Sequence, residues 1–271
     1  MKKLYLLVAI LSMTLLVGCG NEKVSDDREN IIRLDNNCTA YFDVDGDGED
    51  DEIGFTVEED DLVGHYTLTC NDATYKEDVA GPYTFCYLVR LDESKNEYVF
   101  DLQESGMSDD YASHFIGYNN GKLVDLGSCG GIYNSDFKPQ ESIEFNFDGT
   151  FKTSERAQIV QTWFYDTTYS YDKDMIIKNE EDFYHVDYDT ELLTDFEFYK
   201  EPNMNAEKTL VRSETIMKFT GIDNDIWTRV EYLDLYGEKA VAYFPVYYFC
   251  YMDENMETMT SDVFKDLIFA D

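Results

Sequence analysis

Short runs of β-branched and aromatic residues, each followed by a polar turn, recur along most of this chain. Residues 53–57, 66–70, 87–91 and 98–102 have this form. Residues 114–118 and 122–126 flank Asn119-Asn120-Gly121, and an Asn-Gly pair accepts the positive φ angles of a tight hairpin turn. Helical spacing of apolar residues is poor throughout, and the best helix candidate is 261–270, which Ser261 can cap. The pattern predicts an all-β protein with little helix.

The charge of the chain restricts its partners. It carries 57 Asp and Glu against 21 Lys and Arg, a formal net charge of −36 at pH 7. Such a surface repels phosphate backbones, which excludes nucleic acid as a partner, and it attracts cations and basic polypeptides. Aromatic residues make up 15% of the chain, so there is enough apolar mass for packed cores and the chain is not an acidic disordered segment.

The first thirty residues have the features of an export signal. Lys2 and Lys3 precede a mostly apolar run over residues 4–17. This run is shorter than the roughly 20 residues needed to span a bilayer and suits the apolar region of a signal peptide. Leu16-Val17-Gly18-Cys19 resembles the lipobox of bacterial lipoproteins, which implies that Cys19 is acylated; an ordinary signal peptide with an incidental Cys19 is the alternative. We expect a signal peptide over residues 1–18 and a polar tether over 19–30. The protein would then be extracytoplasmic and held at the bacterial cell membrane by its lipid alone.

Five further cysteines leave the redox state open. Export permits disulfides, but an odd number leaves at least one thiol free, and no C-x-x-C or Cys/His metal spacing occurs. The alternative is that most of them are small buried apolar residues. They are Cys38, Cys70, Cys86, Cys129 and Cys250.

An acidic loop carries the clearest chemistry. Aspartates occupy positions 1, 3, 5 and 9 of a segment that also contains Gly46 and Gly48. Calcium takes about six to eight oxygen ligands, whereas magnesium demands a stricter octahedron and retains its waters. We therefore expect calcium to be bound by the side chains of Asp43, Asp45, Asp47 and Asp51 and by the backbone carbonyl of Glu49. An EF-hand is disfavoured because its twelfth position requires a bidentate Glu and is Gly54 here. A solvated acidic turn without metal is the alternative.

Residues 42–53, Phe-Asp-Val-Asp-Gly-Asp-Gly-Glu-Asp-Asp-Glu-Ile, resemble the calcium loop of FG-GAP and VCBS-type repeats, found in integrin-like propellers and bacterial surface proteins. The resemblance implies a calcium ion held between two antiparallel strands, where it stiffens the sheet. Weaker copies of an Asp-containing turn occur at 91–99 and 145–151, a spacing of about 50 residues that is the scale of a propeller blade. We expect an incomplete-propeller, FG-GAP/VCBS-like sheet domain over residues 31–180.

The C-terminal part has a different pattern. Residues 181–271 contain short strands with polar turns, including Trp227-Thr228-Arg229-Val230. This resembles a bacterial Src-homology-3-like barrel, although Ala240 and Val241 replace the Gly-Trp expected in a later strand. The resemblance implies a small barrel that binds cell-wall peptide or acts as a spacer, with Trp227 as a candidate ligand contact. A core or hairpin anchor is the other role for Trp227, because aromatic residues mostly provide packing area.

Catalytic motifs are weak. The three histidines lie in no recognised metal or triad motif, and residues 127–131, Gly-Ser-Cys-Gly-Gly, only superficially resemble a nucleophile loop. The favoured hypothesis is therefore a surface-anchored, calcium-stabilised binding or scaffold module for an extracellular or cell-wall ligand, such as a glycan or a basic protein. The alternative is an extracytoplasmic hydrolase acting on cell wall or glycan. A cleft that gathers two carboxylates, or His114 beside Cys129, would favour the hydrolase.

Overall fold

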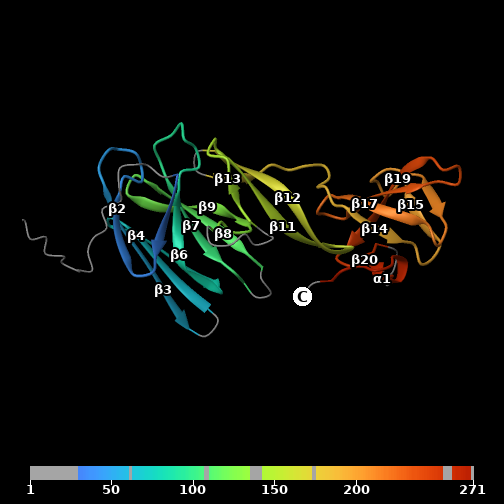
Figure 1. The fold of residues 1–271 in the computed structure, drawn as a ribbon, viewed down its shortest axis with the longest axis horizontal. Helices are drawn as coiled ribbons and strands as arrows, with labels where there is room; N and C mark the ends of the chain where they lie inside the picture. Colours follow the sequence, from blue (N-terminus) through green and yellow to red (C-terminus); the bar gives the residue numbers. More distant parts are fainter. Residues whose placement is uncertain are drawn as a thin grey trace, which may run out of the picture.

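The computed structural model describes residues 30–60, 63–106, 110–134, 142–172, 175–252 and 258–269. The predicted signal peptide, Cys19 and nearly all of the predicted tether lie outside these residues. Within the described ranges the strands form four open antiparallel sheets, which confirms the all-β prediction (Figure 1). The predicted Asn-Gly hairpin is also confirmed, because Asn120 and Gly121 have φ angles of 51° and 71° between two paired strands.

Two sheets form the N-terminal part. The first has the order β2-β3-β4-β5 and the second the order β1-β6-β7-β8-β9. Alternate residues of the first sheet point inward, as Tyr66, Leu68 and Cys70 do, and they pack against Phe100 and Ile116 of the second. The strands are β1 (Ile31–Asp35), β2 (Cys38–Phe42), β3 (Asp51–Asp60), β4 (Val63–Cys70), β5 (Ala73–Ala80), β6 (Pro82–Val89), β7 (Val99–Glu104), β8 (Ala112–Asn119) and β9 (Lys122–Gly130).

A third sheet covers the other face of the five-stranded sheet. It consists of β10 (Glu144–Phe145), β11 (Thr150–Ile159), β12 (Gln161–Asp172) and β13 (Met175–Lys178), in that order. Phe151, Tyr169 and Ile176 of this sheet share a core with Tyr87 and Phe115 of the five-stranded sheet. Because both of its faces are covered, β7 is buried along nearly its whole length.

The C-terminal sheet has the order β14-β17-β18-β19-β15-β16, with β20 paired to β19. Four phenylalanines, Phe198, Phe219, Phe244 and Phe264, fill its core, with ring centroids 5.0 to 6.4 Å apart in their pairs. The elements are β14 (Tyr188–Glu191), β15 (Phe196–Tyr199), β16 (Lys208–Val211), β17 (Ile216–Ile222), β18 (Trp227–Leu233), β19 (Lys239–Tyr247), β20 (Cys250–Tyr251) and α1 (Thr260–Val263).

The long β11–β12 hairpin connects the two parts of the molecule, as Figure 1 shows. Its open end contributes Phe151 and Tyr169 to the core beside the five-stranded sheet. Its turn end contributes Val160 and Trp163 to the C-terminal core. That core therefore takes residues from both sides of residue 180, and the division of the chain at this position stays a prediction.

The helix predicted over 261–270 is wrong in extent. The helix is only α1, and Phe264 directly after it is extended and bridges to Leu192. The backbone beyond the helix finds partners in other segments: Lys265 N–H donates to Glu191 O, and Thr162 N–H donates to Ile268 O. Val263 and Phe264 are consecutive residues, and both are buried in the C-terminal core. The backbone becomes extended at Phe264, so the helix ends before the apolar residues predicted to form its second half.

Candidate metal centre

Three carboxylates converge in the loop between β2 and β3. One oxygen from each of Asp43, Asp45 and Asp47 lies within 4.8 Å of the other two. Gly46 and Gly48 have φ angles of 78° and 92°, a region that glycine enters at little cost. These two glycines allow the loop to turn its aspartates toward one point.

Backbone amides hold the carboxylates in place. Gly48 N–H donates to Asp43 Oδ2 over 3.2 Å, and Glu49 N–H donates to Asp47 Oδ1 over 2.8 Å. Asp47 N–H in turn donates to Asp45 Oδ1 over 3.3 Å. Each predicted side-chain ligand in the first half of the loop therefore accepts a hydrogen bond from a backbone amide of the same loop.

Asp51 lies at the base of the loop, outside the group of three. Its side chain is buried, and its two oxygens accept hydrogen bonds from Val44 N–H over 3.0 Å and from Asn71 Nδ2 over 2.6 Å. Burial raises the pKa of Asp51, and the negative charges of Asp45 and Asp47 raise it further against these two donors. The predicted roles of Asp51 and of the Glu49 carbonyl stay predictions.

A second loop supports the first, and sequence reasoning did not identify its contribution. Tyr98 N–H donates to Val44 O over 2.8 Å, and Asn96 Nδ2 lies 3.5 Å from Asp43 Oδ2. A Cβ on Gly46 would meet the Asn96 carbonyl oxygen at 2.1 Å, so the two loops are in close contact. The signal available in the sequence was the repeated Asp-containing turn at 91–99, which packs directly against the first copy.

The residues present fit a bound cation. Asp43 Oδ1 is buried and has no hydrogen-bond partner. A buried carboxylate oxygen without a donor is costly, and metal coordination is one of the ways in which proteins satisfy it. The donor set consists of oxygens only, which is the chemistry of calcium and not of zinc or copper. In the described ranges no other group of three histidine, cysteine, aspartate or glutamate side chains converges in this way.

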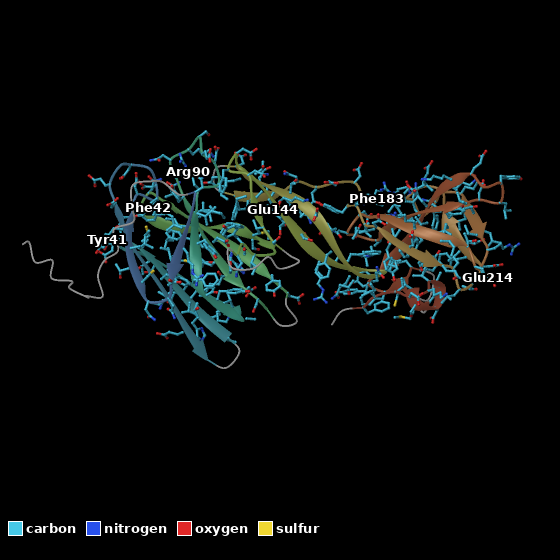
Figure 2. The ribbon with its side chains drawn as sticks, in the orientation of Figure 1. Tyr41, Phe42, Arg90, Glu144, Phe183 and Glu214 are labelled. Atoms are coloured by element: carbon cyan, nitrogen blue, oxygen red, sulfur yellow. The ribbon has the colours of Figure 1, made fainter. Side chains whose placement is uncertain are left out.

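Trp227 is mainly a packing residue at the other end of the molecule. Its side chain is 8% exposed, its ring meets that of Tyr199 edge-on at 5.5 Å, and its backbone N–H donates to Asp223 Oδ1 over 2.8 Å. It nevertheless lines an open hollow of about 700 Å³ together with Phe183, Tyr243 and other residues. The lining also includes the acidic residues Glu181, Asp182 and Asp223 and the basic residue Arg229. In Figure 2 Phe183 lies in the C-terminal part, far from Phe42, which directly precedes the acidic loop.

His114 does not lie beside Cys129, the arrangement that would have favoured a hydrolase. Ser113 pairs with Cys129 and His114 with Ser128 across β8 and β9, so the side chains of Cys129 and His114 leave the sheet on opposite faces. Burial raises the pKa of the Cys129 thiol well above its ordinary value, which keeps it protonated and unreactive.

All five cysteines beyond residue 30 are free thiols. Three of them are buried, as expected for small apolar residues: Cys70, Cys86 and Cys129. The other two, Cys38 and Cys250, are half-buried.

In the part of the chain that the structure describes, no helix has both the length and the apolar character needed to cross a membrane. Comparison with known proteins gives no match to any protein-family model, to any curated protein or to any solved structure.

Proposed function

We propose that this protein is an extracytoplasmic bacterial lipoprotein that acts as a binding or scaffold module stiffened by one calcium ion. The observation that carries the proposal is the convergence of Asp43, Asp45 and Asp47 around a buried, unpartnered Asp43 oxygen. Carboxylates this close repel one another unless a cation neutralises them. In this proposal the loop is of the FG-GAP/VCBS type and the C-terminal sheet is a Src-homology-3-like unit.

The position of the loop favours a structural role for the metal. The loop joins β2 to β3 and contacts the connection between β6 and β7 through Tyr98 and Asn96. Calcium bound there would fix the end of the four-stranded sheet to the five-stranded sheet. The ligand of the module is proposed to be a cell-wall component, a glycan or a basic protein. The acidic, aromatic hollow beside Trp227 supports such a contact by the chemistry of its lining.

Calcium binding is tested on the soluble mature chain by calorimetry and thermal melting. We expect saturable one-site binding that raises Tm, and we expect the chelator EGTA to reverse it. Asp45→Asn should abolish both effects because it removes one converging carboxylate. Asp50→Asn is the matched control, since Asp50 is an exposed acid of the same loop outside the predicted ligand set. Equal losses in the two variants would reduce the site to non-specific charge attraction and refute the proposal.

The membrane anchor needs a separate test. Wild-type protein expressed in a bacterial host should fractionate with membranes and require detergent for release. Cys19→Ala should be released without detergent or remain unprocessed. A variant that stays membrane-bound after signal cleavage would show that the anchor is not a lipid on Cys19.

A further inference from the structure

One internal face of the five-stranded sheet contains a group of buried oxygens without hydrogen-bond partners. They are Tyr87 Oη on β6, Asp101 Oδ1 and Gln103 Oε1 on β7, and Ser113 Oγ on β8. These side chains are at most 2% exposed. In the described part of the chain seven buried side-chain oxygens lack partners, and four of them lie in this one patch. Buried polar atoms normally have a hydrogen-bond partner in the protein, in water or in a bound ion. Four unpartnered oxygens in one patch therefore indicate a bound water or ion that contacts several of them.

The strand register brings these residues together. Tyr87 pairs with Asp101, and Gln103 pairs with Ser113 on the neighbouring strand. Asp101 and Gln103 are two residues apart on β7 and therefore share a face. Gln103 Nε2 donates to Asp101 Oδ2 over 2.7 Å, which leaves Gln103 Oε1 without a donor. The Ser113 hydroxyl lies near the Asp101 carboxylate and lowers its pKa, although its geometry falls short of a hydrogen bond.

The patch also contains a negative charge without a counter-ion. Burial raises the pKa of Asp101 to about 7, and His114 is the basic group whose charge acts against this rise. The His114 imidazole lies on the opposite face of the sheet, where it contacts Glu77 and Glu104. Opposite the Asp101 face, the covering sheet contributes the apolar and aromatic side chains of Phe151, Tyr169 and Ile176. A buried carboxylate in such surroundings must be paired, coordinate a cation or take up a proton.

We propose that this face binds one monovalent cation of sodium size through Asp101, Gln103 and Ser113, with Tyr87 at its edge. One positive charge neutralises the one carboxylate, and the amide and hydroxyl oxygens supply neutral ligands. Calcium is a worse match because it favours several carboxylates. Transition metals are a worse match because the sulfur beside Ser113, the Cys129 thiol, is kept protonated by burial. Water alone would satisfy the hydrogen bonds but would leave the charge unneutralised. A proton on Asp101 would remove the charge but could donate to only one of the oxygens that lack partners.

The site is tested by thermal melting of the mature chain with EGTA present, in sodium chloride and in choline chloride at equal ionic strength. We expect Tm to be higher in sodium and to rise with its concentration. At tenfold above the dissociation constant the rise should be about 3–6 °C for a chain of this length. Asp101→Asn should remove the dependence on sodium and Ser113→Ala should weaken it. Asp45→Asn should retain it in full, which separates this site from the calcium loop.

Three results would overturn the inference. Equal melting of the wild type in the two salts is one of them, and a sodium dependence that survives Asp101→Asn is another. The third comes from crystals of the wild type soaked in thallium, whose anomalous signal should appear between Asp101 and Ser113. An ordered water at that point in place of thallium would show that the patch is hydrated and holds no cation. This measurement needs no variant, so it decides the question even where Asp101→Asn fails to fold.

Discussion

His114 joins two sheets, and its replacement should lower stability in a pH-dependent way. Its Nδ1 lies 3.2 Å from Glu77 Oε1 on β5, and its Nε2 lies 3.4 Å from Glu104 Oε1 on β7. The three side chains are 21–22% exposed. The imidazole therefore bridges the four-stranded and five-stranded sheets in a site that water reaches only in part.

The direction of the pH dependence follows from the contacts. The Glu104 hydrogen bond raises the pKa of His114 above its ordinary value, and the charges of Glu77, Glu104 and Asp101 add to this effect against burial. A histidine whose pKa is raised on folding stabilises the fold fully below its unfolded pKa, about 6.5. That contribution disappears as pH rises through the folded value. Glu104 has a lowered pKa because of its His114 hydrogen bond, so its contribution is lost in turn as pH falls through its folded value.

The size of the effect can be worked from the geometry. A hydrogen bond to a charged group contributes roughly 1.5–3 kcal/mol, and the two long contacts here belong at the low end. We therefore expect about 2 kcal/mol for the pair, which corresponds to about 4–8 °C in Tm for a chain of this length. His114→Gln should show this loss at low pH and little of it at high pH.

The assay is thermal melting of the wild type and of His114→Gln between about pH 5.5 and about pH 9, a range that brackets histidine titration. His185→Gln is the control because His185 is an exposed histidine. A difference between wild type and His114→Gln that is the same at both ends of the range would refute the reasoning. So would a pH-dependent loss of equal size in His185→Gln.

Two further predictions concern the acidic loop and the hairpin that connects the two parts. Gly46→Ala should cost about 2 kcal/mol or more and weaken calcium binding, because the new Cβ would lie 2.1 Å from the Asn96 carbonyl oxygen at a positive φ. Gly48→Ala, which meets nothing within 4 Å, should show only the smaller cost of its φ angle, and equal melting of the two variants would contradict this. Glu155→Gln should lower the free energy of unfolding, measured by urea denaturation, by about 3 kcal/mol. The reason is that this half-buried carboxylate accepts hydrogen bonds from a lysine and two tyrosines. A decrease of less than about 1 kcal/mol would contradict the prediction.

The features that could be predicted from the sequence are local. Alternating apolar residues locate β3, β4 and β18, and the Asn-Gly turn locates the hairpin of β8 and β9. The spacing of Asp43, Asp45 and Asp47 identifies the loop whose carboxylates converge. Each of these depends on neighbours a few residues apart, for which spacing and turn chemistry are sufficient.

The sheet order and the connecting hairpin could not be predicted in this way. β1 pairs with β6 and β14 with β17, so the partners are separated by several other strands or by a long segment of chain. The β11 sequence, Thr-Phe-Lys-Thr-Ser-Glu-Arg-Ala-Gln-Ile, has no clean alternation because its two ends pack in different cores. The strand is held in place by the elements on either side of it, and those lie elsewhere in the sequence.

The buried polar side chains of β7 also could not be predicted from their local sequence. Val99, Asp101 and Gln103 alternate with Phe100 and Leu102, a pattern in which the two polar residues read as part of a solvent face. All five are buried, because the sheet of β10 to β13 covers that face with residues such as Phe151 and Ile176, which come 50 and 75 positions after Asp101 in the chain. Without the third sheet the Asp101 face would be open to water, which hydrates a carboxylate. With the sheet in place the carboxylate is buried and its pKa is raised, so the packing of the third sheet is what creates the proposed cation site. A chain from which this sheet is displaced should lose sodium dependence together with the burial of β7.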